Sequence, residues 1–363
     1  MNLLITGGAG FIGSQFIRQH LTQRVDNDGV VVNLDKLTYA GSTENLAEFA
    51  GWSGYIFHHG DIADGASAES LLENNSIDAI VHFAAETHVD RSIDSPEPFF
   101  TTNVMGTLRL LDSARRYWTR LGSDRAKRFR FLHVSTDEVY GSLEDNEEPF
   151  RENSPILPNS PYAASKAAGD HLVQSYHNTY GFPAIIARCS NNYGPYQFPE
   201  KLIPLMILNA LEGKPLPIYG DGSHIRDWIF VDDHCRALAQ ILERGRPGEV
   251  YNASGRCEKT NLEVAKAVCG GLDAIRPRAG SGSYLELITF VEDRPGHDRR
   301  YAVDCGKLEA ELGWKPDTRF DEAISATVDW YLHNQEWCNH ITKEVYRRER
   351  LGVISNEPEK PSV

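Results

Sequence analysis

The stretch Leu3-Leu4-Ile5-Thr6-Gly7-Gly8-Ala9-Gly10-Phe11-Ile12-Gly13 joins an apolar run directly to a cluster of glycines. The apolar run predicts a short buried strand, and the residues after the glycines predict a helix. Gly8, Gly10 and Gly13 fit the pattern G-x-G-x-x-G. The variant G-x-x-G-x-x-G starts instead at Gly7 and shares the other two glycines. Glycines at such positions let the backbone turn tightly and approach a pyrophosphate at the helix N-terminus.

A second apolar run, residues 30–34, ends in Asp35, about 20 residues beyond the last of these glycines. A carboxylate there accepts hydrogen bonds from the adenosine ribose and repels a 2′-phosphate, which favours NAD over NADP. Lys36 follows directly and would soften this preference. The alternative is a glycine-rich turn that binds no nucleotide.

Further strands are predicted at 55–59, 79–83, 129–134 and 184–188, and helices alternate with them. This order indicates an α/β protein with a Rossmann-type doubly wound parallel sheet. A helix predicted at 98–119 carries apolar residues at near-helical spacing. One face of it would pack on the core, and a second apolar face could form a dimer surface.

The alternation weakens after residue 190, where charged residues are interspersed with Pro and Gly loops. We therefore expect an NAD-binding Rossmann domain at 1–190 with a return segment at about 226–258. A smaller C-terminal substrate-binding lobe is expected at 191–225 and 259–350. The last dozen residues, 352–363, are expected to form a loose tail.

The composition excludes several classes of protein. A length of 363 residues suits about two lobes, and 41% hydrophobic residues is ordinary for a globular chain. No apolar run of about 18 residues predicts a membrane span, and the N-terminus lacks the basic region of a signal peptide. The six cysteines are scattered without a C-x-x-C pair, which favours reduced thiols in the cytoplasm. The net charge of −14 argues against nucleic acid as a partner.

Histidines offer no metal site by their spacing. Those near the predicted strands lack a helical i,i+4 pair or a carboxylate at ligand spacing. We expect a structural role and no metal for these residues: His58, His59, His82 and His88.

Candidate catalytic groups lie in two further stretches, HVSTDEVYG at 133–141 and YAASK at 162–166. The first follows a predicted buried strand, and ligands bind beyond the carboxyl ends of parallel strands. Tyr162 and Lys166 are four residues apart on a predicted helix and therefore share a face. A nearby ammonium and an oxidised nicotinamide would lower the pKa of the phenol from its usual ~10 and make it a base. The alternative is a surface Tyr and Lys on an ordinary helix.

Adjacent Asp137 and Glu138 suggest elimination of water. Such a reaction needs a base for one proton and an acid for the leaving hydroxyl, and two carboxylates can divide these tasks if their pKa values differ. The alternative is a solvated turn or a helix N-cap. Arg226 and Arg294 are candidate diphosphate ligands because guanidinium forks suit phosphate oxygens.

Eight motifs resemble the extended short-chain dehydrogenase/reductase family, and within it the dTDP-glucose 4,6-dehydratases. They extend over nearly the whole chain, and several are long and consecutive. The motifs are TGGAGFIGS (6–14), LDKLTYAGSTENL (34–46), FAAETHVDRSI (83–93), VSTDEVYG (134–141), SPYAASKA (160–167), RCSNNYGPYQFPEKLIP (188–204), YGDGSHIRDWIFVDDHC (219–235) and RPGHDRRYA (294–302).

The resemblance implies a cytoplasmic, homodimeric hydro-lyase that uses NAD to dehydrate dTDP-glucose for deoxysugar (rhamnose-type) synthesis. It implies that NAD contacts Gly7, Gly10, Phe11, Ile12, Gly13, Asp35, Lys36, Leu37, Thr38, Asp61, Ile62, Phe83, Ala84, Ala85, Thr87, Thr102, Tyr162, Lys166 and Asn192. It implies that the sugar nucleotide contacts Thr87, Thr136, Asn191, Glu200, Lys201, Leu202, Pro217, Ile218, Tyr219, Arg226, Asn261, Asp293, Arg294 and His297.

The resemblance also implies catalytic roles. Tyr162, with Thr136 beside it and Lys166 on the same helix face, deprotonates the sugar 4-hydroxyl while hydride leaves C4. Glu138 takes the C5 proton and Asp137 protonates O6, after which hydride returns at C6. The alternatives are a sugar-nucleotide epimerase or decarboxylase of the same family, and a 4,6-dehydratase for a UDP-, CDP- or GDP-sugar. A nucleotide-sensing regulator that binds NAD without chemistry is a further alternative.

Overall fold

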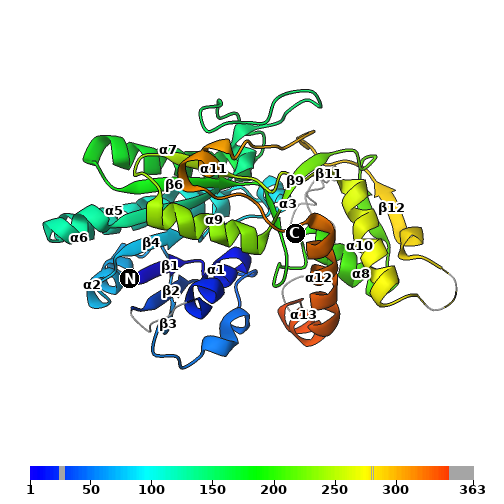
Figure 1. Cartoon of the computed structure of the whole chain (residues 1–363), viewed down its shortest axis with the longest axis horizontal. Coiled ribbons are helices and arrows are strands. Elements are labelled where there is room, and N and C mark those ends of the chain that lie inside the picture. Colours follow the sequence, from blue (N-terminus) through cyan, green and yellow to red (C-terminus); the bar gives the residue numbers. More distant parts are fainter. Residues whose placement is uncertain (24–28, 279, 281, 343–363) are drawn as a thin grey trace, which may run out of the picture.

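The chain forms a seven-stranded parallel sheet with helices on both faces and a smaller lobe at one side (Figure 1). The structure is a computed structural model and describes residues 1–23, 29–278, 280 and 282–342. The predicted Rossmann-type α/β class is confirmed. The tail predicted at 352–363 lies outside the described residues.

The central sheet has the strand order β10-β6-β5-β4-β1-β2-β3, and all of its neighbouring strands run parallel. Its strands are β1 (Leu3–Thr6), β2 (Val31–Asp35), β3 (Tyr55–His59), β4 (Ala79–His82), β5 (Arg130–Thr136), β6 (Ala184–Cys189) and β10 (Val250–Ala253). In register, Thr6 pairs with His82 and Thr136 pairs with Cys189. The strands therefore end together along one edge of the sheet.

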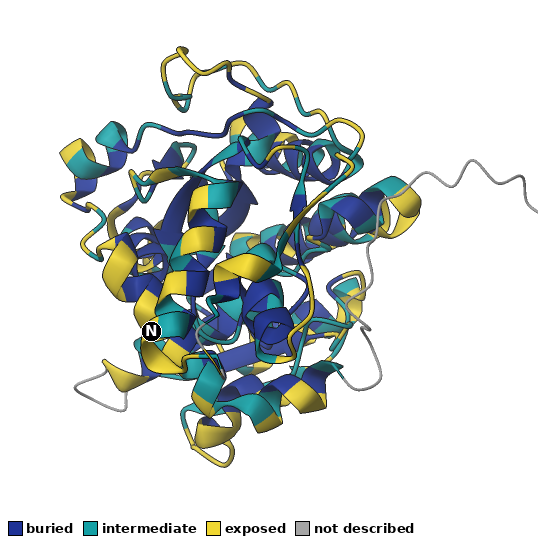
Figure 2. Ribbon diagram, turned by 90° about the vertical axis from the view of Figure 1, so that its right-hand side faces the viewer, coloured by how far each residue is buried: buried dark blue, intermediate teal, exposed yellow. Residues whose placement is uncertain are grey.

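Alternate residues of the strands supply two apolar cores, one on each face of the sheet. Leu3 and Ile5 pack on one side with the helices α1 (Phe11–Thr22), α9 (Val231–Arg244) and α11 (Gly306–Leu312). Leu4 packs on the other side with α2 (Gly65–Asn74), α5 (Thr107–Thr119) and α7 (Pro161–Tyr180). Figure 2 shows the strands buried and the outer faces of the helices exposed.

The helix predicted at 98–119 is confirmed, but it contains a π-helical turn that the sequence did not predict. The structure has α4 (Glu97–Phe100), a π-helical turn at Thr101–Gly106 and then α5. The π turn places Asn103 inside the protein, where it is 2% exposed. Its side-chain amide donates hydrogen bonds to the carbonyl of Glu86 (3.0 Å) and to Ser165 Oγ (2.8 Å). The turn thereby ties the segment after β4 to the helix that carries Tyr162.

The larger lobe, which contains the central sheet, also has four shorter helical segments. They are η1 (Thr43–Phe49), α3 (Val89–Asp94), α6 (Ser123–Arg128) and η3 (Asp137–Tyr140).

The smaller lobe has a core of its own. It contains two small sheets, β11-β9-β7 and β12-β8. Its elements are β7 (Asn191–Tyr193), α8 (Leu202–Leu211), β8 (Leu216–Tyr219), β9 (Ile225–Phe230), β11 (Glu258–Thr260), α10 (Asn261–Ile275), η4 (Tyr284–Leu287), β12 (Ile288–Val291), α12 (Phe320–His333) and α13 (Gln335–Thr342).

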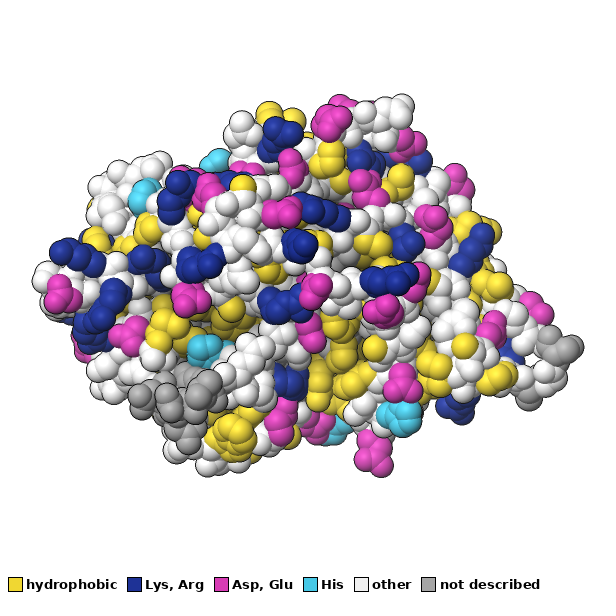
Figure 3. Space-filling view, viewed as in Figure 1, with side chains coloured by type: hydrophobic (Ala, Val, Ile, Leu, Met, Phe, Trp, Pro, Cys, Tyr) yellow, Lys and Arg dark blue, Asp and Glu magenta, His cyan; other side chains and the backbone are white. Residues whose placement is uncertain are grey.

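Within the return segment predicted at 226–258, α9 and β10 lie on the central sheet, whereas β9 pairs with β7 and β11. In the described part of the chain, no helix is long and apolar enough to cross a membrane. Basic and acidic side chains are intermingled on the face shown in Figure 3.

Candidate active site

A cavity of about 300 Å³ lies at the carboxyl edge of the central sheet, where β1, β2, β4, β5 and β6 end. It brings together most of the predicted cofactor and catalytic residues. The predicted residues that line it are Gly7, Gly10, Phe11, Ile12, Gly13, Asp35, Lys36, Thr38, Asp61, Ile62, Phe83, Ala84, Ala85, Thr87, Thr102, Thr136, Asp137, Glu138, Tyr162, Lys166, Asn191, Asn192, Glu200 and Lys201.

The other predicted ligands lie outside this lining. Leu37 borders a neighbouring cavity beside α13. The rest lie in the smaller lobe and are Leu202, Pro217, Ile218, Tyr219, Arg226, Asn261, Asp293, Arg294 and His297. Among them Ile218 is 0% exposed and belongs to the core of that lobe.

Sequence reasoning missed several residues of the lining. Most of them lie inside the motifs already quoted, next to predicted residues, so their position in a motif was the available signal. They are Leu34, Ala40, Gly41, Gly60, Glu86, Val134, Ser135, Cys189, Ser190, Gln197 and Phe198.

The glycine turn at the start of α1 follows the register that begins at Gly7. This residue has φ +70°, and a Cβ on it would lie 2.6 Å from the backbone nitrogen of Ala84. A Cβ on Gly13 would lie 2.4 Å from the carbonyl oxygen of Gly7. Gly8 instead packs against the side chain of Asn33 and does not line the cavity. Because these residues have no side chain, the backbone N–H groups at the N-terminus of α1 can approach a bound pyrophosphate closely.

Asp35 ends β2 and is held by backbone donors. Its two oxygens accept hydrogen bonds of 2.8 Å each from the backbone N–H groups of Ala9 and Leu37. Each carboxylate oxygen retains a second lone pair for a ribose hydroxyl. The Lys36 ammonium lies 2.7 Å from Asp61 Oδ2, so its charge is offset within the protein. The chain therefore fits NAD, because the Lys36 ammonium is already paired and offers less charge to a 2′-phosphate.

Tyr162 and Lys166 are both buried on the first turns of α7. Ser160 caps this helix by accepting from the backbone N–H of Ala163. Lys166 Nζ donates a 2.8 Å hydrogen bond to the carbonyl of Val134 at the end of β5. Lys166 therefore links the start of α7 to the end of β5.

The pKa of Tyr162 lies well above its usual value, because the phenol is buried and lies near the negative charge of Glu138. Burial lowers the pKa of Lys166. The chain's own groups thus shift Tyr162 in the direction opposite to the expected lowering. The charge of a bound nicotinamide is needed to reverse it.

Asp137 and Glu138 occupy the short η3 turn directly after β5. Thr136 Oγ1 donates to Asp137 Oδ1 (3.3 Å) and accepts from the backbone N–H of Glu138 (3.3 Å). Asp137 Oδ2 is buried and has no hydrogen-bond partner among the described residues. One carboxylate oxygen therefore remains available to a ligand.

The two carboxyl groups differ in electrostatic environment. Burial and the nearby charges of Glu138 and Asp227 raise the pKa of Asp137 well above its usual value. Burial also raises the pKa of Glu138, but Arg294, Arg226 and Lys201 oppose this shift. The shift at Asp137 favours its protonated form, which suits this group to the role of an acid.

The two candidate diphosphate arginines lie close to this carboxylate pair but already have partners. Arg226 donates to the carbonyls of Ile225 (2.7 Å) and Asp298 (3.0 Å). Arg294 donates to Asp90 Oδ1 (2.7 Å), which joins the smaller lobe to α3 of the larger one. A diphosphate bound by Arg294 would share this guanidinium with Asp90.

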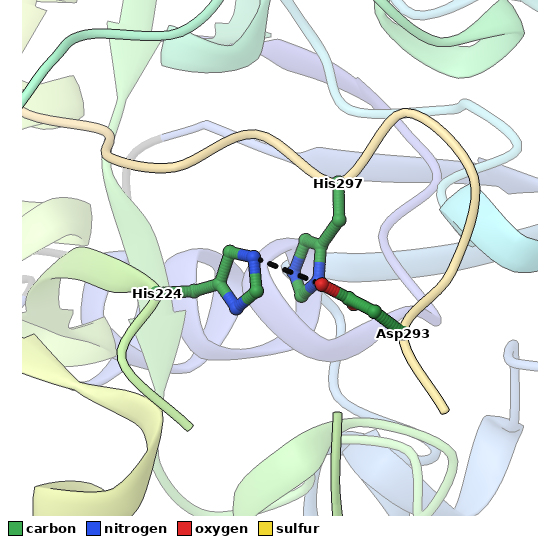
Figure 4. Close-up of side chains that lie close together, drawn as sticks. All are labelled: His224, Asp293 and His297. Carbon is green, nitrogen blue, oxygen red and sulfur yellow. Dashed lines mark hydrogen bonds and ion pairs between the residues drawn. The ribbon is translucent and has the colours of Figure 1, made fainter. Parts of the chain in front are cut away.

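His224, Asp293 and His297 form a cluster that the sequence did not predict (Figure 4). His297 Nδ1 and His224 Nε2 lie 2.6 and 3.2 Å from the two oxygens of Asp293. The imidazole rings stack with centroids 3.7 Å apart and an interplanar angle of 17°. Stacked rings hold their in-plane lone pairs in two nearly parallel planes, so these lone pairs do not converge on one point. We therefore interpret the cluster as a hydrogen-bonded unit rather than a metal site.

The four histidines for which a structural role was expected each have a hydrogen-bond partner. His82 bonds to Thr6 and Thr107 in the core, and His88 accepts from a backbone N–H of α3. His58 lies near Ser67 Oγ, and His59 near the carbonyl of Lys36.

The family model for GDP-mannose 4,6 dehydratase matches residues 4–327. A dTDP-glucose 4,6-dehydratase of Xanthomonas campestris is 54% identical over 350 residues, which cover 96% of this chain and 98% of the relative. Two solved dTDP-glucose 4,6-dehydratases, both with NAD bound, have the same fold. The Streptomyces venezuelae double mutant matches with TM-score 0.85 and 46% identity, over 94% of this chain and 100% of that one. The Bacillus anthracis enzyme matches with TM-score 0.83 and 43% identity, over 94% and 99%.

These matches extend over nearly the whole chain and include the glycine turn, the carboxylate pair and the Tyr–Lys helix. The chain therefore belongs to the 4,6-dehydratase family of sugar-nucleotide enzymes, and within it to the dTDP-glucose 4,6-dehydratases of the extended short-chain dehydrogenase/reductase type.

Proposed function

We propose that this protein is a hydro-lyase that converts dTDP-glucose to dTDP-4-keto-6-deoxyglucose with NAD as its cofactor, for deoxysugar synthesis. The observation that carries the proposal is the pair Asp137 and Glu138, which faces the same cavity as Tyr162 and Lys166. Relatives that are 50–54% identical over nearly their whole length and bear this name support the choice of substrate.

NAD would be held at the glycine turn and Asp35, and it would supply the hydride acceptor for C4 and the hydride donor for C6 of the sugar. Tyr162 takes the proton of the 4-hydroxyl, with Thr136 as a further hydrogen-bond partner of that oxygen. Glu138 removes the C5 proton, which the 4-keto group has made acidic, and a proton returns to C5 when hydride adds to C6. Asp137, whose pKa is raised because it is buried beside other acids, protonates O6 as water leaves. Lys166, held by its hydrogen bond to the carbonyl of Val134, supplies positive charge to the cavity that Tyr162 also lines.

The residues proposed for the sugar nucleotide fall into two groups. Thr87, Asn191, Glu200 and Lys201 line the cavity itself. The segment at 217–219, Arg226, Asn261 and the segment at 293–297 would hold the nucleotide from the smaller lobe. Closure of that lobe over the substrate would bring the second group to the diphosphate and base.

An epimerase of the same family is the main alternative, because it uses the same Tyr–Lys pair. Such a reaction expels no 6-hydroxyl and has no use for a buried acid such as Asp137. A further alternative is a 4,6-dehydratase that acts on a UDP-, CDP- or GDP-sugar and so recognises a different nucleotide base.

Mass spectrometry of the products from dTDP-glucose and UDP-glucose tests the proposal. We expect loss of one water from dTDP-glucose and little reaction of UDP-glucose. The purified protein should carry NAD, and no net NADH should accumulate in the reduced-nicotinamide absorbance band. Stoichiometric NADH release would indicate a simple dehydrogenase, and an isomer of unchanged mass would indicate an epimerase.

We also infer that the protein is a homodimer in the cytoplasm. Exposed apolar side chains on the predicted dimer helix, Phe100 (42% exposed) and Met105 (46%), support a partner there. Six free cysteines, five of them buried, support a reducing compartment.

A further inference from the structure

Two loops that border the cofactor cavity are joined by side chains. One loop, residues 36–41, follows β2, and the other, residues 197–201, follows β7. Both contribute residues to the cavity lining. The Tyr39 hydroxyl donates a 2.7 Å hydrogen bond to Glu200 Oε1 and so connects them. This hydrogen bond joins two residues that are 161 positions apart in the sequence.

Arg91, from α3, completes the contact. Its Nε donates a 3.1 Å hydrogen bond to Glu200 Oε2, and its guanidinium carbon lies 4.1 Å from the centroid of the Tyr39 ring. Phe198 packs edge-on against the same ring with centroids 5.4 Å apart. The side chain of Glu200 is 1% exposed and both its oxygens are paired. We refer to Tyr39, Arg91 and Glu200 as the clasp.

A second hydrogen bond links the loop at residues 197–201 to another segment of the cavity lining. Lys201 Nζ donates a 2.9 Å hydrogen bond to the carbonyl of Thr87, in the segment after β4. Segments after β2, β4 and β7 are thus linked to one another around the cavity. Opening the clasp would leave a buried carboxylate without its partners, which is unfavourable.

We propose that the clasp retains NAD in the cavity and that its opening controls the rate of NAD dissociation. The inference rests on the proposed function, in which one cofactor molecule must stay bound from the oxidation at C4 to the reduction at C6. Hydrogen bonds to a buried charged group are among the stronger ones in proteins. A neutral substitution in the clasp should therefore speed release without removing any group that contacts the dinucleotide phosphates.

The test measures NAD dissociation directly. Protein loaded with isotopically labelled NAD is mixed with excess unlabelled NAD, and the bound label is followed over time. Tyr39→Phe keeps the ring against Arg91 and Phe198 and removes only the hydroxyl. We expect it to release NAD roughly tenfold faster, as for loss of one hydrogen bond to a charged group. Glu200→Gln, which keeps the shape and removes the charge, should also accelerate release.

The matched control is Tyr251→Phe. The Tyr251 hydroxyl donates a 2.9 Å hydrogen bond to Glu311, so the control loses the same kind of Tyr–Glu bond outside the cavity lining. Its NAD dissociation should match that of the unmodified protein. If Tyr39→Phe and Glu200→Gln both release NAD within twofold of the control, the clasp does not retain the cofactor and the proposal is wrong.

The chase experiment does not depend on turnover. If the unmodified protein binds NAD but does not dehydrate dTDP-glucose, the proposed function fails while the effect of the clasp is still measured. If dehydration occurs and the clasp variants release NAD at the control rate, only the clasp proposal fails.

Discussion

At the scale of single residues, the division of labour between Asp137 and Glu138 decides the reaction. Asp137→Asn keeps the shape but removes the proton donor for O6, so oxidation at C4 should survive. Elimination should slow by the ~10²–10⁴ typical of a lost general acid. Glu138→Gln should instead stop the exchange of the C5 proton with D₂O, which NMR or mass spectrometry detects.

A substrate with a better leaving group separates the two roles. In dTDP-6-fluoro-6-deoxyglucose, the 6-substituent leaves without being protonated. Its turnover should restore much of the rate in Asp137→Asn and little in Glu138→Gln. Equal rescue of both variants, or of neither, would mean that the acid and base roles are assigned wrongly.

The raised pKa of Asp137 also predicts an effect on stability. The folded protein holds this proton more tightly than the unfolded chain, whose Asp titrates near ~3.9, so the ionised group destabilises the fold as pH rises above that value. Asn carries no such cost and can still accept from Thr136. Asp137→Asn should therefore raise the unfolding temperature, and by more at pH 8 than at pH 5, as measured by calorimetry. A difference from the unmodified protein that does not grow with pH would contradict this explanation.

The direction of the Tyr162 pKa shift shows where reasoning from residue spacing ends. The spacing of Tyr162 and Lys166 correctly placed both side chains in one cavity. It gave no information on burial or on the charge of Glu138, which together raise the pKa of the phenol. Those contributions depend on which strand ends lie side by side, and that is a property of the folded sheet.

At the scale of elements, α1 depends on a glycine that contacts the turn before it. A Cβ on Gly13 would lie 2.4 Å from the carbonyl oxygen of Gly7, and one on Gly270 in α10 would have no heavy atom within 4 Å. Gly13→Ala should destabilise the fold by ~1–3 kcal/mol, because the backbone must shift, and should weaken NAD binding. Gly270→Ala should stabilise it by ~0.5–1 kcal/mol through helix propensity.

Denaturant unfolding and NAD titration of the two glycine variants measure these effects. The pair controls for the general effect of replacing a helical Gly with Ala. If both variants changed stability in the same direction, the close contact at Gly13 would not explain the effect.

The helices and strands of the larger lobe were the most predictable part of the fold. The strands at 55–59 and 79–83 and the helix that starts near Tyr162 lie where the sequence pattern predicted them, to within one residue. The π turn at 101–106 was not predictable in this way. One extra residue in a helical turn leaves the apolar spacing almost unchanged, and its cause, the burial of Asn103 between Glu86 and Ser165, is tertiary.

At the scale of the whole molecule, the clasp and the Asp90–Arg294 ion pair were beyond sequence reasoning, although each residue lies inside or beside a quoted motif. Tyr39 and Glu200 are 161 residues apart, and Asp90 and Arg294 are 204 apart. Motifs indicate which residues serve the site, but only the fold indicates which of them bind one another instead of a ligand. Arg294 is the clearest case, because its predicted partner was a diphosphate.

The last prediction concerns assembly. The segments that begin near Pro98 and Pro161 pack together in the larger lobe, through contacts of α7 with the π turn and α5. Pairing them across a two-fold axis would form a four-helix bundle with an isologous interface, in which each residue occurs twice. Light scattering at micromolar concentration should therefore give twice the subunit mass.

A charged side chain in that interface would meet its own copy or apolar surface, so Met105→Glu should shift the protein toward one subunit mass. The control is Leu285→Glu, which alters a side chain of similar exposure (45% against 46% for Met105) in the smaller lobe. It should leave the mass unchanged, because η4 packs on the core of the smaller lobe, whereas the proposed interface helices belong to the larger one. One subunit mass for the unmodified protein would contradict the dimer. A dimer that Met105→Glu leaves intact would place the interface elsewhere on the molecule.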